Sequence, residues 1–202
     1  MFYKIVIIIM RLYLRIFNRW TIIGRENIPQ QGPLVLIGNH VSYWDPVILA
    51  CSVNREVHFM AKTELFNVPI FRQIIKWLHA FPVKRGSPDR NALRTSSEIL
   101  NNGKVLALFP EGTRSKTGEL LPFQPGAALL ALRAKAPIVP IMMLGSRSTF
   151  PLSIRGKIEV RIGEPMYFNE LVEQKVSGEE LEKASLAVRE KMLSLSKEVQ
   201  RS

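Results

Sequence analysis

The segment "LVLIGNHVSYWDP", residues 34–46, gives the clearest indication of the fold. Its first part, 34–38, is apolar without alternation, which is typical of a strand buried on both faces of a sheet. The pair Asp45-Pro46 then fits a helix N-cap followed by a first-turn proline. A buried strand that leads within a few residues into a helix predicts an α/β unit, and it places His40 in the connecting turn.

Apolar runs alternate with amphipathic segments along the rest of the chain. The strands that we expect lie at 34–38, 57–60, 80–83, 105–109, 138–144 and 157–162. The helices that we expect lie at about 46–53, 64–78, 88–101, 125–135 and 178–199. Ser87-Pro88 and Gly103 are start and stop signals for the third helix, and Ser177 with Glu180 forms a capping box at the last. This order predicts a single α/β domain with a mostly parallel or mixed central sheet flanked by helices.

Composition limits the class of partner. The chain has 202 residues, of which 47% are hydrophobic, which is enough for one domain with a proper core. Lys and Arg number 28 against 17 acidic residues, a net charge of +11, and such an excess indicates an anionic partner: nucleic acid, a membrane surface or a phosphorylated substrate. A single cysteine, Cys51, excludes an internal disulfide and fits a reducing compartment. Because no Cys/His cluster has zinc-ligand spacing, we expect no metal site.

Residues 1–20 have the character of a helix on a membrane surface rather than of a membrane span. The uncharged apolar run, Ile5–Met10, is much shorter than the roughly 20 residues that a span needs, and no signal-peptide cleavage site follows it. At about 100° per residue the polar side chains fall within one arc, and apolar side chains fill most of the rest. The polar residues on the arc are Lys4, Arg11, Arg15, Asn18 and Arg19. This pattern predicts an amphipathic helix among lipid headgroups, while a core-packing helix with a charged edge stays open.

His40 and Asp45 raise the question of catalysis. Each has an ordinary structural explanation, since Asp45 can cap a helix and His40 can be a polar residue that ends a strand. Ligands, however, bind at the carboxyl ends of strands in α/β sheets. A carboxylate that accepts from one imidazole nitrogen fixes the tautomer and makes the other nitrogen a general base. Positions i and i+5 of a regular helix diverge by about 140°, so a contact requires the turn to curl back. From spacing alone, both explanations stay open.

A second polar segment, "FPEGTRSKTG" at 109–118, also follows a predicted strand. Gly112 allows close backbone approach, Glu111 and Thr113 offer polar contacts, and the guanidinium group of Arg114 suits phosphate. The segment is not a Walker loop, because no Gly-Lys-Ser/Thr follows at the required spacing.

A third segment, "FPVKRG" at 81–86, places Lys84 and Arg85 after another strand. Each segment by itself could be a charged surface turn. Three strand ends that together carry a candidate base and two guanidinium groups favour convergence on one anion-binding site.

The chain resembles the 1-acylglycerol-3-phosphate acyltransferases, the lysophosphatidic acid acyltransferases of phospholipid synthesis. The motifs that carry the resemblance are "NHVSYWD" (39–45) for the NHxxxxD block, "FPVKRG" (81–86) for the second, "FPEGTRS" (109–115) for the third and "APIVPI" (136–141) for the fourth. Their order and spacing agree, as do "AKTEL" (61–65) and "FQPGAALLA" (123–131). The resemblance covers residues 20–165.

This resemblance implies a mechanism of direct acyl transfer. His40, oriented by Asp45, removes the proton from the 2-hydroxyl of lysophosphatidic acid, and the alkoxide attacks the thioester of an acyl-CoA or acyl-carrier protein. The residues expected to bind substrate are Arg85, Glu111, Gly112, Thr113 and Arg114 at the acceptor phosphate, and Lys62 near the thioester oxyanion. No cofactor or metal is required. We expect Cys51 to be a small buried residue, which favours direct transfer over an acyl-cysteine intermediate.

Since the substrates are amphiphiles, the resemblance also gives the N-terminal helix a purpose. We predict a membrane-associating helix over 1–20 and an acyltransferase domain over 21–202, bound to anionic phospholipid on the cytoplasmic face of the cell membrane as a peripheral or monotopic protein. Residues 66–81 can add to this contact or cover the sheet.

Two other functions stay open. One is a sister acyltransferase that uses glycerol 3-phosphate or another lysolipid. The other is a non-catalytic basic protein that binds lipid or nucleic acid. We expect no nucleic-acid partner, since such a protein has no need for a His–Asp pair beside the EGTR segment.

Overall fold

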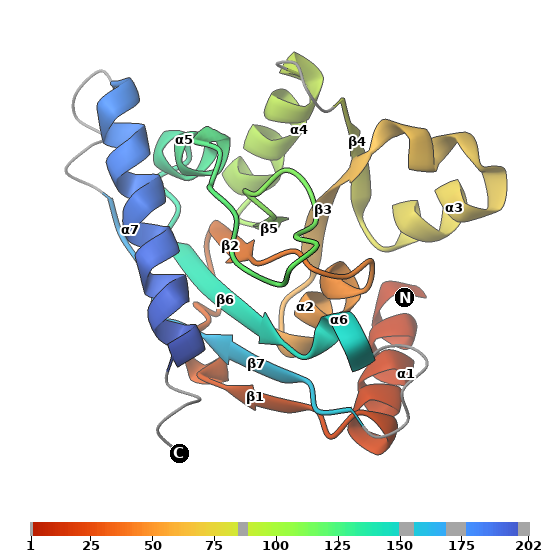
Figure 1. The fold of residues 1–202 in the computed structure, drawn as a ribbon. Helices are drawn as coiled ribbons and strands as arrows, with labels where there is room; N and C mark the ends of the chain where they lie inside the picture. The colour runs from red at the N-terminus through yellow and green to blue at the C-terminus, as the bar shows by residue number, and fades with distance from the viewer. Residues whose placement is uncertain (1, 85–88, 150–155, 169–176, 198–202) are drawn as a thin grey trace.

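The structure is a computed structural model that describes residues 2–84, 89–149, 156–168 and 177–197. A seven-stranded sheet runs through the centre in the order β1-β7-β6-β2-β5-β3-β4 (Figure 1). Its strands are β1 (Thr21–Ile23), β2 (Leu34–Gly38), β3 (Val57–Lys62), β4 (Ala80–Val83), β5 (Val105–Leu108), β6 (Ile138–Leu144) and β7 (Glu159–Ile162). In the described part of the chain every neighbouring pair is parallel except β6 with β7. The sheet is therefore mixed and mostly parallel, as the sequence predicted.

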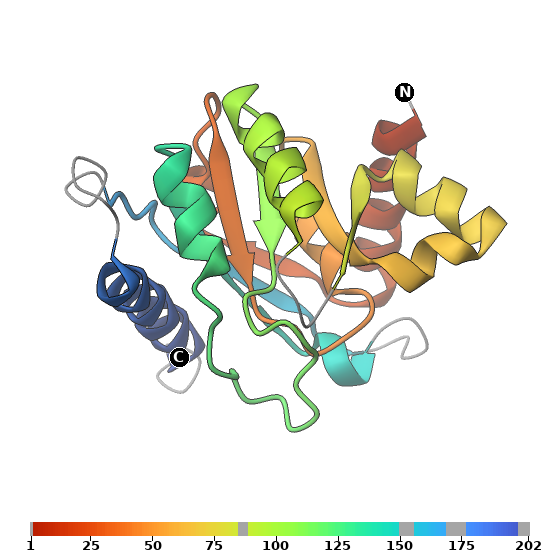
Figure 2. The same ribbon diagram turned by 90° about the horizontal axis from the view of Figure 1, so that it is seen from above.

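Helices cover both faces of the sheet, because its central strands are apolar on both sides (Figures 1 and 2). The helices are α1 (Phe2–Phe17), α2 (Asp45–Ser52), α3 (Pro69–Trp77), α4 (Arg90–Asn101), α5 (Gly126–Arg133), α6 (Ser146–Thr149) and α7 (Gly178–Lys197), with 3-10 turns η1 (Arg25–Asn27) and η2 (Thr63–Asn67). Leu34 and Leu36 of β2 join the core under α1 and α2. Val35 and Ile37, on the opposite face, join the core under α4, α5 and α7.

The strand predictions hold more closely than the helix predictions. Three expected strands, at 34–38, 80–83 and 138–144, match the observed bounds, and β1 and α6 were not expected. The helix expected over 64–78 is wrong as a single helix, because it divides into η2 and α3 at Pro69. Proline lacks an N–H and forces the preceding residue, Val68, into an extended conformation (φ −90°, ψ 112°).

Helix starts also differ from two sequence signals. Residues 85–88, which include the expected cap Ser87, lie outside the described residues. The N-cap of α4 is Asp89, whose Oδ1 accepts from the backbone N–H groups of Asn91 and Ala92 in the first turn. Asp45 is the first residue of α2 and does not cap it, since the N-cap position is Trp44. The capping box of Ser177 and Glu180 is confirmed by reciprocal backbone contacts of 2.7 and 3.2 Å.

Helix α3 lies away from the central layers. It projects beyond the β4 edge of the sheet on the side of the molecule that carries the N-terminus (Figure 1). Its described side chains are exposed apart from a half-buried Ile75. The rings of Phe2 in α1 and Trp77 in α3 lie 4.2 Å apart, so the two helices meet. Residues 66–81 therefore do not form a helix that covers the sheet.

Candidate active site

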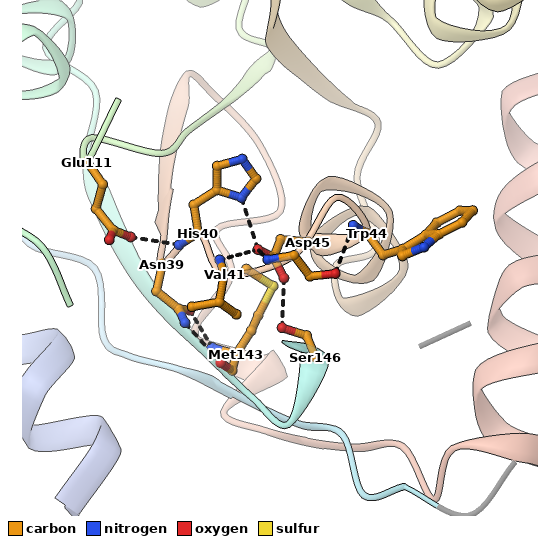
Figure 3. A network of polar contacts seen from close by, with 9 residues as sticks. Asn39, His40, Val41, Trp44, Asp45, Glu111, Met143 and Ser146 are labelled. Atoms are coloured by element: carbon orange, nitrogen blue, oxygen red, sulfur yellow. Dashed lines mark hydrogen bonds and ion pairs between the residues drawn. The ribbon is translucent and has the colours of Figure 1, made fainter. Parts of the chain in front are cut away.

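His40 and Asp45 form a buried pair at the carboxyl end of β2 (Figure 3). The Nδ1 atom of His40 lies 2.9 Å from Oδ2 of Asp45, and the two residues are 8% and 0% exposed. An ionised carboxylate can only accept, so Nδ1 carries the proton and Nε2 is the basic nitrogen. The imidazole also stacks on Phe109 at 4.4 Å between ring centroids, which fixes the plane of the ring.

The turn between the two residues curls back as a contact between them requires. The backbone N–H groups of Val41 and Ser42 donate to Oδ2 of Asp45, both at 2.7 Å. The Asp45 carboxylate therefore binds backbone N–H groups of the turn before α2, rather than those of the first turn of the helix. This is the physical reason that an i, i+5 pair can meet although a regular helix would separate it.

Asn39 fixes the start of the same turn to the neighbouring strand. Its side-chain amide donates to the carbonyl of Met143 at 3.0 Å and accepts from the N–H of Met143 at 2.7 Å. The amide thereby continues the β2–β6 pairing by one residue past the end of β2. Asn39 is the first residue of the NHxxxxD block, and sequence analysis assigned it no separate role.

Glu111 holds His40 through the backbone. Its Oε1 accepts from the N–H of His40 at 2.7 Å, and its Oε2 accepts from the N–H of Leu121 at 3.1 Å. Burial raises the pKa of this carboxyl, and the two backbone N–H groups partly oppose the shift. We predicted that Glu111 binds phosphate. In the structure its two oxygens accept from the backbone at His40 and Leu121, so its place at the phosphate stays a prediction.

The segment 109–118 also binds the other side of the His40 peptide. The N–H of Ser115 donates to the carbonyl of His40 at 2.8 Å. Both backbone groups of His40 are therefore held by the segment that follows β5, the parallel neighbour of β2. The expected convergence of these two segments is confirmed.

Arg114 of this segment lies above an aromatic ring. The guanidinium carbon of Arg114 is 3.4 Å from the ring centroid of Tyr43, whose side chain is 75% exposed. A planar cation stacked on a ring keeps its edge donors free for an anion. Thr113 beside it is exposed, and Gly112 has φ +67°, a conformation that favours glycine. No pattern in the sequence indicated this contact of Tyr43, apart from its place within the NHxxxxD block.

The other predicted substrate residues are less clearly placed. Arg85 lies outside the described residues, and its neighbour Lys84 is exposed at the end of β4. Lys62 ends β3 and forms an exposed ion pair with Glu64, with Nζ 3.1 Å from the carboxylate. The oxyanion role of Lys62 stays a prediction.

A cavity of about 600 Å³ opens beside the site. It is bounded by apolar side chains of α4, β5 and α5, including Leu93, Ala127 and Leu130. Phe109, which stacks on His40, and Gly112 lie at one side of it, and Lys84 also lines it. Its volume falls within the range of about 300–1,000 Å³ that is usual for small-molecule sites.

Cys51 is buried in α2, as expected, and burial raises the pKa of its thiol to about 12. A thiol with this pKa is a poor nucleophile at neutral pH. Among the described residues, no three His, Cys, Asp or Glu side chains come together as a metal site would require.

Comparisons with known proteins show which family the chain is similar to. The family model described as Acyltransferase matches residues 19–144. The chain is 34% identical over 145 residues to the 1-acyl-sn-glycerol-3-phosphate acyltransferase of Bacillus subtilis, covering 71% of this chain and 72% of that protein. It is 32% identical to the chloroplastic 1-acyl-sn-glycerol-3-phosphate acyltransferase BAT2 of Brassica napus, covering 75% of this chain but only 46% of that protein.

A solved structure extends the similarity to the whole fold. The crystal structure of the 1-acyl-sn-glycerophosphate acyltransferase PlsC from Thermotoga maritima matches with a TM-score of 0.77 and 28% sequence identity. The match covers 96% of this chain and 78% of that chain, so it includes elements outside the four motifs.

Proposed function

Because this chain belongs to the acyltransferase family that includes the 1-acyl-sn-glycerol-3-phosphate acyltransferases, we propose that it forms phosphatidic acid. It transfers an acyl group from an acyl thioester, either acyl-CoA or acyl-carrier protein, to the 2-hydroxyl of 1-acylglycerol 3-phosphate. The observation that carries this proposal is the buried His40–Asp45 pair, with Nδ1 and Oδ2 2.9 Å apart.

The geometry supports direct transfer. His40 Nε2 accepts the proton of the 2-hydroxyl as the oxygen attacks the thioester carbonyl. The tetrahedral intermediate then expels the thiolate, which takes the proton back from the imidazolium. Asp45 stabilises the imidazolium without itself becoming protonated. Each proton and each bond is thus accounted for by the two substrates and one histidine, with no need for a cofactor or for Cys51.

Arg114 supports recognition of the acceptor phosphate. Its stacking on Tyr43 places a guanidinium group on the segment that holds the His40 backbone. We propose that Arg114 binds the phosphate together with Arg85, and that Thr113 and the backbone at Gly112 contribute polar contacts. Bidentate contacts of this kind would orient the acceptor for attack.

The cavity beside Phe109 suits the apolar part of a substrate. It lies next to the ring on which His40 stacks, and most of its lining is aliphatic. We propose that an acyl chain occupies it during transfer.

An exposed apolar surface supports attachment to a membrane. On α1 and α3 with its neighbouring turn, many large apolar side chains face outward: Phe2, Ile5, Ile8, Ile9, Leu12, Ile16, Leu65, Val68, Ile70, Ile74 and Trp77. Exposed basic residues accompany them: Lys4 and Arg15 on α1, Arg72 and Lys76 on α3, and Arg19 shortly after α1. We propose that this α1/α3 surface lies in the headgroup region of an anionic bilayer on the cytoplasmic face of the cell membrane. In the described residues, no helix has the length and apolarity needed to cross a bilayer.

The function can be tested by measuring thiol release with purified protein. Lysophosphatidic acid, glycerol 3-phosphate and other lysolipids are each supplied with acyl-CoA and with acyl-carrier protein. Fastest release with 1-acylglycerol 3-phosphate, with phosphatidic acid as product, is the expected result. Faster release with glycerol 3-phosphate or another lysolipid would assign the chain to a sister activity. Binding of lipid without thiol release from either donor would overturn the enzymatic proposal.

A further inference from the structure

Ser146 contacts the catalytic pair from a distant part of the sequence (Figure 3). Its hydroxyl donates to Oδ1 of Asp45 at 2.7 Å across a sequence separation of 101 residues. Both residues are 0% exposed, so bulk water does not reach Oδ1 to replace the hydroxyl as donor. The other carboxylate oxygen, Oδ2, accepts from His40, Val41 and Ser42. Ser146 is therefore the donor on the side of the carboxylate that faces away from the imidazole.

The backbone before Ser146 is built to aim it inward. Gly145 has φ +82°, which favours glycine, and a Cβ atom at this position would collide with the backbone carbonyl of Lys157. The turn directly follows β6, which pairs with β2. Two residues earlier, Met143 is bound through its backbone to the amide of Asn39. The end of β6 thus holds the His40–Asp45 turn at both of its ends.

We propose that Ser146 is a positioning residue for the acyl transfer reaction, which sets the orientation of the Asp45 carboxylate and through it that of the His40 imidazole. This inference rests on the proposed function. It adds Ser146 to the His40–Asp45 pair. The Ser146 hydroxyl donates to Oδ1 of Asp45, and Nδ1–H of His40 donates to Oδ2. The serine does not touch substrate and is not a nucleophile.

The physical reason lies in the two ends of the carboxylate. If Oδ1 lost its donor, a buried anion would be left with one unpaired oxygen. The carboxylate could relieve this by rotating toward other donors, and the imidazole would then lose its fixed direction. Catalysis depends on the aim of Nε2 within a fraction of an ångström, whereas the strength of substrate binding at Arg114 does not. Loss of Ser146 should therefore affect turnover more than substrate affinity.

Ser52 offers a matched control. It is also a fully buried serine, its hydroxyl also donates at 2.7 Å, and it lies in α2, the helix that begins at Asp45. Its acceptor, however, is the backbone carbonyl of Ile48 within the same helix. Removing this hydroxyl deletes an equally buried hydrogen bond without touching the carboxylate.

The test compares Ser146→Ala, Ser146→Thr and Ser52→Ala in the full-length protein, with 1-acylglycerol 3-phosphate and acyl-CoA or acyl-carrier protein. We expect Ser146→Ala to lower kcat about 10- to 100-fold, the range that loss of a hydrogen bond to a charged group corresponds to, with the KM for the acceptor changed less than about twofold. Ser146→Thr, which retains the hydroxyl, should keep most of the activity. Ser52→Ala should keep a near-normal kcat, although its melting temperature should fall about as much as that of Ser146→Ala. The proton resonance of His40 Nδ1–H should shift in Ser146→Ala and stay unchanged in Ser52→Ala.

Several results would overturn the inference. One is a kcat for Ser146→Ala that falls only as far as that of Ser52→Ala, and another is an unchanged His40 proton resonance. If Ser146→Thr does not fold, the test rests on Ser146→Ala alone. A loss of kcat with little change in KM, together with a shifted His40 resonance, would support the positioning role. If the wild-type protein transfers no acyl group to any acceptor, the proposed function fails, whereas the resonance of His40 still tests whether Ser146 orients the pair.

Discussion

Among single side chains, the turn that carries His40 and Asp45 is held by hydrogen bonds from several distant parts of the chain. The His40 backbone is bound on both sides by the segment after β5, through Glu111 and Ser115. The Asp45 carboxylate accepts from its own turn and from Ser146. A turn held by this many buried hydrogen bonds is rigid, because rotation of any of these groups would leave an unpaired polar atom in the interior.

The first prediction concerns the catalytic pair. His40→Ala removes the general base, and since general-base catalysis contributes about 10²–10⁴-fold, we expect at least that loss of kcat in a folded protein. Asp45→Asn should also be impaired, because an amide disturbs the tautomer and direction of the imidazole. Thiol release measures activity, and circular dichroism confirms folding. Near-normal turnover in folded His40→Ala protein would refute the mechanism.

The second prediction concerns Arg114. In Arg114→Lys a point charge replaces a planar group that stacks on Tyr43, so we expect the KM for the acceptor to rise more than the KM for the thioester donor. Steady-state kinetics with each substrate varied in turn measure both constants. An equal rise in both would indicate that Arg114 supports the segment 109–118 rather than the phosphate.

Among helices and strands, α1 shows that one helix can serve two surfaces. Tyr3, Ile7 and Leu14 pack into the core, while the opposite side of the helix is apolar and exposed. The basic residues of α1, which are Lys4, Arg11 and Arg15, do not all face the same way. Arg11 donates to the carbonyls of Cys51 and Val53 at the end of α2, so the prediction that it faces lipid is wrong. The carbonyls at a helix C-terminus have no partner within the helix and attract a cation, which explains its position.

This difference gives a third prediction. Arg11→Gln should lower the free energy of unfolding by about 1–3 kcal/mol, because it removes hydrogen bonds to carbonyls of α2. The matched change Arg15→Gln, at an exposed position on the same helix, should stay within about 0.5 kcal/mol but should weaken binding to anionic vesicles. Urea unfolding and vesicle flotation measure the two effects. Equal stability of both variants would contradict the bracing role of Arg11.

Helices α4 and α5 bound the cavity that we assign to an acyl chain, which gives a fourth prediction. Ala127 lines the cavity from α5, and Ala127→Leu would fill part of its volume. We expect this variant to favour shorter acyl chains, with little change in turnover for the shortest ones. The measurement is thiol release with a series of chain lengths. A uniform loss across the series would show that the cavity does not hold the chain.

For the protein as a unit, the α1/α3 surface that we propose for membrane attachment lies on one side of the molecule. The α1/α3 surface lies on the side that carries the N-terminus, whereas α7 lies on the far side in both views (Figures 1 and 2). The ring contact of Phe2 with Trp77 joins the two helices into one surface.

The fifth prediction tests this surface. Ile9 and Ile70, which are 59% and 78% exposed, are replaced together by Gln. Full burial of one such side chain is worth about 1.5–3 kcal/mol, so partitioning onto anionic vesicles should fall more than tenfold. Leu186→Gln, at a 50% exposed position on α7, is the control and should leave partitioning unchanged.

Activity provides the second measurement for this variant. Turnover of a dispersed short-chain acceptor should be near normal, because the His40 turn is untouched, while turnover of acceptor embedded in vesicles should fall with binding. Unchanged binding of the double variant would exclude the α1/α3 surface. Resistance of the wild-type protein to extraction by high salt and alkaline carbonate would indicate a deeper attachment than an interfacial one.

The fold class and the position of the catalytic pair follow from local patterns in the chain. Continuous apolar runs identify the strands, and β2, β4 and β6 have the bounds that these runs predict. The central strands β2 and β6 are buried, whereas the edge strand β4 is only half-buried. His40 was recognisable because it follows such a strand, and Asp45 because its block resembles that of a known family. These features depend on residues close in sequence, where periodicity and turn chemistry act directly.

The remaining features depend on which surfaces meet in space. An apolar helix face indicates that something covers it but not what, so the sequence could not distinguish the covered side of α1 from the exposed one. Glu111 was recognisable as a polar residue near the site, yet only its contacts with two backbone N–H groups indicate a positioning role. Ser146 gave no signal, because its hydroxyl gains its role only when β6 pairs with β2 and brings it to a carboxylate 101 residues away. Hydrogen bonds between distant segments follow from the packing of the sheet, and the packing is decided by the whole chain at once.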